Sequence, residues 1–142
     1  MLEFKAAITI KAPPASVWAV LADLSRWPEW DPSCEAIEGR LITHGALTVR
    51  SKLSPKRPFR LSISELNAGH KMVWTGGMPL GLFTGVRTFV LTSPESGVTR
   101  FSIKEEFSGP LLFMVKGSLP DLDGVFKQFC EGLKKRCEGG SQ

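Results

Sequence analysis

Six short segments in which polar and apolar residues alternate occupy most of residues 34–108, and turns rich in Gly, Pro, Ser and Asn separate them. Alternation with a period of two is typical of strands that bury one face. Connections this short join neighbouring strands in antiparallel order. This part of the chain therefore predicts an antiparallel meander, and a sheet with one apolar face needs a second layer to cover that face.

The two ends of the chain supply one more strand and the covering helix. Residues 3–11 alternate like the later strands, and residues 14–30 follow with helical spacing up to the turn before Pro32. Near the C-terminus an apolar stripe recurs every three or four residues: Leu122, Phe126, Phe129, Cys130, Leu133 and Cys137. This stripe predicts one long amphipathic helix. We therefore expect an α+β domain in which that helix covers a curved antiparallel sheet.

The predicted hairpins can be checked for register, because apolar residues should meet on the buried face. The turn NAGH pairs Ile63 with Trp74, and SPESG pairs Phe89 with Ile103 and Leu91 with Phe101. The turn PKRP is expected to pair Leu53 with Phe59 and Val49 with Ile63.

Four stretches resemble the START-like (SRPBCC) superfamily of polyketide cyclase/dehydrase and lipid-transport proteins: ITIKAPPASVWAVLADLSRWPEWDP, VWTGG, SGVTRFSI and FCEGLKKRCE. The likeness covers nearly the whole chain, which implies a single domain over residues 1–142. It also implies the helix-grip fold, in which seven antiparallel strands curve around the long helix and a cavity lies between them. Such cavities hold lipids, polyketides, isoprenoids or hormones, and some members of the superfamily are enzymes.

The segment WPEWDP carries two of the four tryptophans. Trp27 and Trp30 are three residues apart, so both should lie on one helical face and pack against the end of the sheet. Trp30 is also a candidate to line the mouth of the cavity.

Arg87 and Glu105 form the most informative polar pair. Each shares its strand face with large apolar residues, and the register that pairs Phe89 with Ile103 sets them opposite one another. A charged pair facing the interior would be a polar anchor in an apolar pocket. The alternatives are a purely structural ion pair and a one-residue bulge that turns either side chain outward. In an enzyme, Glu105 would act as acid or base and Arg87 would stabilise an enolate.

The residues expected to face the cavity share the inward side of the strands or the stripe of the long helix. They are Trp30, Val49, Leu61, Ile63, Trp74, Met78, Phe83, Arg87, Phe89, Phe101, Ile103, Glu105, Phe126 and Phe129. Met78 and Phe83 belong to the glycine-rich stretch MPLGLFTG, which we interpret as a loop that either gates the cavity or packs onto the core.

Charge and cysteine content restrict the other functional classes. The net charge of +4 is too small and too dispersed for a nucleic-acid binder. The cysteine and histidine residues lack metal-ligand spacing, so no metal or cofactor is predicted. No secretion signal or apolar span of membrane length is present, and we expect a cytoplasmic protein.

The bases Lys52, Lys56, Arg57 and Arg60 cluster at one hairpin, which is either a solvated face or a peripheral contact with an anionic membrane.

Three functions remain open. The first is binding or transport of an apolar small molecule, and the second is a cyclase or dehydratase that uses Glu105 and Arg87. The third is a co-chaperone-like module for protein interaction, which an exposed apolar patch and a filled interior would favour.

Overall fold

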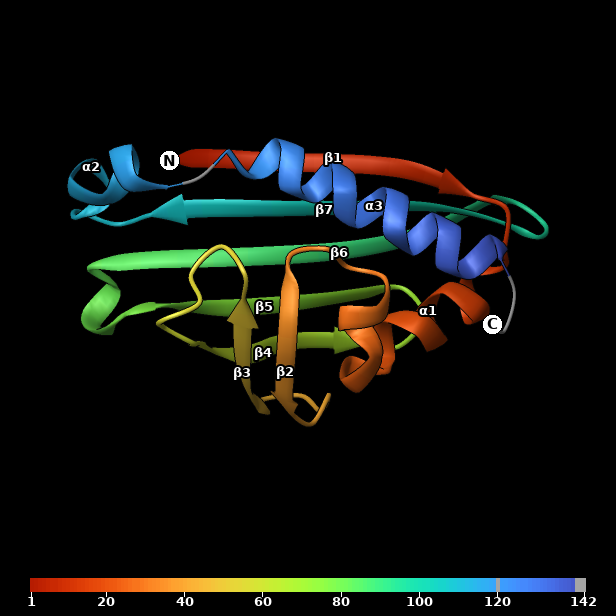
Figure 1. Ribbon diagram of the computed structural model, residues 1–142, viewed down its shortest axis with the longest axis horizontal. Coiled ribbons are helices and arrows are strands. Elements are labelled where there is room, and N and C mark those ends of the chain that lie inside the picture. The colour runs from red at the N-terminus through yellow and green to blue at the C-terminus, as the bar shows by residue number, and fades with distance from the viewer. Residues whose placement is uncertain (120, 140–142) are drawn as a thin grey trace.

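The structure is a computed structural model that describes residues 1–119 and 121–139 (Figure 1). Seven antiparallel strands form one sheet in the order β1-β7-β6-β5-β4-β3-β2. The strands are β1 (Leu2–Ile10), β2 (Cys34–Gly39), β3 (Ala46–Ser51), β4 (Phe59–Asn67), β5 (Lys71–Met78), β6 (Phe83–Glu95) and β7 (Val98–Ser108). The helices are α1 (Pro14–Ala22), η1 (Leu24–Glu29), η2 (Pro79–Gly81), α2 (Leu112–Val115), η3 (Lys116–Ser118) and α3 (Leu122–Glu138). The α+β helix-grip fold predicted from the sequence is confirmed.

Helix α3 lies across the sheet beside β1 and β7 (Figure 1) and buries the predicted stripe except for Cys137, which is half-buried. It also protects the free edge of the sheet. Asp123 accepts a hydrogen bond from the backbone N–H of Lys5 at 2.9 Å, and Glu138 accepts one from the N–H of Lys11 at 2.8 Å. Since β1 is an edge strand, these carboxylates satisfy donors that could otherwise pair with another chain.

Trp27 lies at the centre of the core. Its ring stacks on Trp74 with centroids 5.3 Å apart and contacts Trp30, Phe89 and Phe129 at 5.1, 6.1 and 5.2 Å. Its indole N–H donates to the carbonyl of Leu21 at 2.9 Å. The aromatic residues of WPEWDP therefore join η1, the sheet and α3 into one buried cluster, as the structural reading of that segment predicted.

The register is as predicted in two hairpins and different in a third. Ile63 pairs with Trp74, Phe89 with Ile103 and Leu91 with Phe101. The predicted pairing of Val49 with Ile63 and of Leu53 with Phe59 is wrong, because Val49 pairs with Phe59. Strand β3 ends at Ser51 and a seven-residue connection, 52–58, replaces the four-residue turn. Pro55 and Pro58 lie in this connection, and neither can donate a ladder hydrogen bond.

The glycine-rich stretch is shorter as a loop than predicted. Strand β5 continues to Met78 and β6 begins at Phe83, and these two residues pair with one another. Only residues 79–82 form the connection. The ring of Phe83 stacks on Phe107 at 5.5 Å, which holds the start of β6 against β7.

The three cysteines are free thiols whose ionisation is unfavourable in the folded protein. Burial raises the pKa of Cys130 from 9.0 to about 12 and raises the pKa values of Cys34 and Cys137 to about 11. An unfolded chain loses these protons at lower pH than the folded chain does. The free energy of unfolding should therefore fall as the pH rises above 9.

We predict that this alkaline loss amounts to about 1–2 kcal/mol for Cys130 between pH 8 and about pH 10.5. Urea unfolding at both pH values, on the wild type and Cys130→Ala, measures it. The variant should show a smaller difference between the two pH values. An unchanged difference would mean that the Cys130 thiol does not contribute.

Candidate ligand-binding site

The predicted ion pair between Arg87 and Glu105 forms on the concave face of the sheet. The two residues are opposite one another in β6 and β7. Arg87 donates from Nη2 at 2.7 Å and from Nε at 3.2 Å, and both bonds end on Oε1 of Glu105. The guanidinium lies 5.0 Å from the ring centroid of Phe126 on α3, so the pair faces the helix. The alternative in which a bulge turns either side chain outward is excluded, because the register is regular from Thr84 to Thr92.

The pair is not sealed inside the protein. The side chain of Arg87 is 26% exposed and that of Glu105 is 11% exposed. Both bonds from Arg87 end on Oε1 of Glu105. The other oxygen, Oε2, has no hydrogen-bond partner among the described residues. Gly85, two residues before Arg87, has no side chain to cover this oxygen, and a Cβ atom added there would lie 3.7 Å from Oε2. The arrangement leaves a carboxylate oxygen and a fixed guanidinium available to a polar group.

Exposure of the concave face increases toward one end of the sheet. Along β4, Ile63 is buried, Leu61 is half-buried and Phe59 is exposed. Along β5, exposure likewise rises from Trp74 to Met78. Arg87 and Glu105 therefore stand where the buried interior meets the open end of the sheet.

The predicted lining residues divide according to this gradient. The buried ones are Trp30, Ile63, Trp74, Phe89, Phe101, Ile103, Glu105, Phe126 and Phe129. Val49, Leu61, Phe83 and Arg87 are half-buried, and Met78 is exposed. The structure brings the buried aromatic rings into contact with one another around Trp27. The half-buried apolar residues lie on strands β3, β4 and β6.

Two buried indole N–H groups, those of Trp30 and Trp74, have no hydrogen-bond partner among the described residues. A buried donor without a partner destabilises the fold by about 1–3 kcal/mol, so a hydrogen-bond acceptor that reached either N–H would recover part of this free energy. A carbonyl or hydroxyl oxygen could supply one.

Asp31 is a buried charged group that the sequence analysis did not select. It is 5% exposed, and burial raises the pKa of its carboxyl. Hydrogen bonds from the N–H and Oγ of Ser33 and the positive charges of Arg87 and Lys52 oppose that rise. The sequence Asp-Pro indicated only the end of a helix. That Asp31 lies within the electrostatic reach of Arg87 depends on how η1 packs against the sheet.

The model of the family "Polyketide cyclase / dehydrase and lipid transport" matches residues 1–138. The chain belongs to this family. The resemblance of the sequence to START-like proteins is thereby confirmed. Among curated proteins, no sequence matches the chain.

Solved structures with the same fold include a hypothetical protein, a START superfamily protein and an aromatase/cyclase. A hypothetical protein from Helicobacter pylori is 13% identical, with a TM-score of 0.77 and coverage of 96% of this chain and 88% of that one. A START superfamily protein from Mycobacterium smegmatis is 10% identical, with a TM-score of 0.71 and coverage of 98% and 99%. The Zhui aromatase/cyclase from Streptomyces sp. R1128 is 11% identical, with a TM-score of 0.72 and coverage of 96% and 93%. At these identities the likeness establishes the fold and not the activity.

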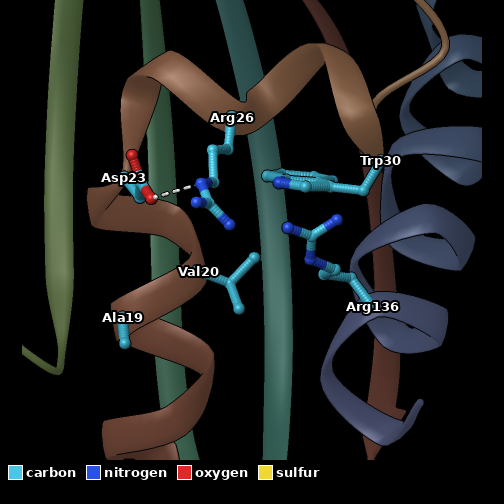
Figure 2. Close-up of a pocket in the computed structure, with 6 residues that line it drawn as sticks. All are labelled: Ala19, Val20, Asp23, Arg26, Trp30 and Arg136. Atoms are coloured by element: carbon cyan, nitrogen blue, oxygen red, sulfur yellow. Dashed lines mark ion pairs between the residues drawn. The ribbon is translucent and has the colours of Figure 1, made fainter. Parts of the chain in front are cut away.

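A surface pocket lies away from the ion pair, between α1, η1 and α3 (Figure 2). Figure 2 shows Arg26 and Arg136 on either side of the pocket, close to the ring of Trp30. Arg26 pairs with Asp23 at 3.5 Å and Arg136 with Glu29 at 2.7 Å. Because an acid already neutralises each guanidinium, this pocket offers weaker recognition of an anion than its two arginines suggest.

None of the helices within residues 1–119 and 121–139 is long and apolar enough to cross a bilayer.

Proposed function

We propose that the protein binds an apolar small molecule that carries a hydroxyl or carbonyl group, and that this group contacts Arg87 and Glu105. The observation that carries the proposal is the position of the ion pair. It lies on the concave face, facing Phe126 of α3, and both side chains keep part of their surface exposed. Membership of a family of polyketide cyclases and lipid-transport proteins supports the same class of ligand, namely a lipid or polyketide, and an isoprenoid-like molecule would share their apolar character.

The chemistry of the pair suits a neutral polar group better than a charged one. A hydroxyl can donate to Oε2 of Glu105, and a carbonyl can accept from the guanidinium of Arg87. A ligand carboxylate would attract Arg87 but would be repelled by Glu105, whose Oε1 lies within 3.2 Å of the guanidinium of Arg87. Half-buried apolar residues that pack against the core, Leu61 and Phe83 among them, would supply most of the affinity.

The test compares 2-naphthol with naphthalene, two ligands that differ by one hydroxyl. We predict that the wild type binds 2-naphthol more tightly than naphthalene in a fluorescence titration. The double variant Arg87→Leu/Glu105→Leu removes both charges together, which avoids leaving either one buried and unpaired. It should weaken 2-naphthol by about tenfold or more, since hydrogen bonds to charged groups contribute about 1.5–3 kcal/mol. Naphthalene should be affected much less.

Arg100→Leu is the matched control. Arg100 is an exposed arginine on the same strand as Glu105 and donates to Thr9. Its replacement should leave both affinities unchanged. Equal losses of affinity for the two ligands in the double variant would show that the ion pair stabilises the fold and does not recognise the hydroxyl. Absence of binding to either ligand by folded wild-type protein would contradict the proposal.

A second function, dehydration of a β-hydroxy ketone, is favoured by the unpartnered Oε2 of Glu105. We propose that in this reaction Oε2 removes the proton next to the carbonyl while Arg87 donates hydrogen bonds to the enolate oxygen. Glu105 then returns the proton to the departing hydroxyl, which leaves as water, and the enone remains. Glu105→Gln should abolish enone formation, followed by its ultraviolet absorbance, and retain ligand binding. Wild-type protein that binds such a ketone without converting it would be a binder only.

A further inference from the structure

Large apolar side chains are exposed together at the open end of the molecule. Leu80 is 97% exposed, Phe113 77%, Met114 66%, Met78 43% and Leu82 39%. We call these five residues the apolar tip. They lie in η2 and α2 and beside them, and Figure 1 shows both elements at the same end of the sheet. Exposed apolar residues that are clustered, rather than scattered singly, indicate an interaction surface.

The chain holds the two halves of the tip side by side. The backbone N–H of Leu111 donates to the carbonyl of Leu82 at 2.9 Å. Gly109 has a φ of +110°, and a Cβ atom there would lie 2.6 Å from the same carbonyl oxygen, so the close approach depends on this glycine. Since Thr84 pairs with Ser108, both connections leave the sheet at the same level. The tip is therefore one surface made from two segments distant in the sequence.

Leu80 shows that the exposure has a structural cost. Its φ is +62°, in the left-handed region that residues with a Cβ rarely adopt. The backbone at the apex of the β5–β6 connection is thus strained at a leucine whose side chain is almost fully exposed. Strain combined with exposure of an apolar side chain is more typical of a functional surface than of a neutral turn.

The three connections at this end of the strands carry only basic charges. The segments 52–60, 78–84 and 109–119 contain Lys52, Lys56, Arg57, Arg60 and Lys116 and no acidic residue. All five bases are exposed, and within the described chain none of them forms an ion pair. Phe59 follows the 52–58 connection and lies two residues beyond the Leu61–Gly76 pair, which places this basic segment beside the end of β5.

From this geometry we infer that the tip docks onto an anionic membrane surface. The apolar side chains would enter the boundary between headgroups and acyl chains, and the unpaired bases would contact anionic headgroups. The charge pattern favours a lipid surface over a second copy of this chain, because two copies would bring two basic borders together. Docking would also place the open end of the sheet, with Arg87 and Glu105 behind it, against the bilayer.

Co-sedimentation with lipid vesicles tests this inference. The wild type should bind vesicles of mixed phosphatidylserine and phosphatidylcholine, bind pure phosphatidylcholine far less, and dissociate as salt is raised. Lys56→Glu/Arg57→Glu should reduce the partition coefficient by at least about 25-fold, since each base near an anionic surface contributes a factor of about five and each new glutamate is repelled in addition. Leu80→Ser/Phe113→Ser should reduce it by about tenfold or more through the loss of apolar burial.

Matched controls distinguish the effect of the tip on vesicle binding from the effects of net charge and of exposed apolar residues elsewhere. Lys127→Glu/Lys135→Glu changes the net charge by the same amount on α3, and Ile42→Ser removes an exposed apolar residue from the β2–β3 connection. Both should bind vesicles nearly as the wild type does. Equal losses in controls and tip variants, or no preference for anionic vesicles, would overturn the inference. So would self-association through Leu80 without vesicle binding, measured by sedimentation velocity. The vesicle assay contains no small-molecule ligand, so its result is independent of the ligand titration.

Discussion

Replacing Trp27 with alanine should lower the free energy of unfolding by about 3–5 kcal/mol, the usual cost of removing a buried aromatic side chain. The ring is 2% exposed and contacts four other aromatic rings. Its removal would leave a space bounded by η1, the sheet and α3, and these elements cannot all close it. The lost indole N–H would also leave the carbonyl of Leu21 without its donor.

Urea unfolding followed by far-ultraviolet circular dichroism measures this loss. Trp18→Ala is the matched control, because Trp18 is a half-buried tryptophan at the border of the same core. Trp18→Ala should lower the free energy of unfolding by less than half as much as Trp27→Ala, because Trp18 buries less apolar area. A loss below about 1 kcal/mol for Trp27→Ala would mean that the aromatic cluster does not organise the core.

The second large effect is expected at Gly132, where α3 meets the segment WPEWDP. A Cβ atom at this position would overlap with the backbone carbonyl oxygen of Trp30 and would lie 3.8 Å from Pro32. Because the obstacle is backbone, the helix itself would have to move away. Gly132→Ala should therefore destabilise the protein by about 3 kcal/mol, the upper range for overpacking.

Gly124 provides the control within the same helix. No atom lies within 4 Å of a Cβ added at Gly124, so Gly124→Ala should stabilise the protein by about 0.5–1 kcal/mol through helix propensity. Chemical unfolding of both variants gives the comparison. If the two substitutions had effects of the same sign, α3 would not approach Trp30 as closely as the structure shows.

The interior pair could be predicted because strand geometry is periodic. Once Phe89 is set opposite Ile103, the alternation of side chains places Arg87 opposite Glu105 without further information. The apolar stripe of α3 followed equally directly from helical spacing. Both are local patterns, and both are confirmed.

Features that depend on packing between distant segments could not be predicted in the same way. The register of β3 with β4 is set by a connection whose two prolines do not reveal its length. The burial of Asp31 requires the position of η1 on the sheet. The apolar character of the η2 and α2 connections was visible in the sequence, but their contact depends on the hydrogen bond from Leu111 to Leu82.

The central claim is that a small molecule contacts the Arg87–Glu105 pair at the open end of the sheet. Amide chemical-shift mapping by NMR, during titration with 2-naphthol, tests it most directly. The account predicts that the largest shifts occur at Gly85 and Phe107, whose backbones pair beside Glu105, and at the side-chain Nε–H of Arg87. Shifts confined to the surface pocket lined by Arg26, Trp30 and Arg136, with none near Glu105, would contradict it.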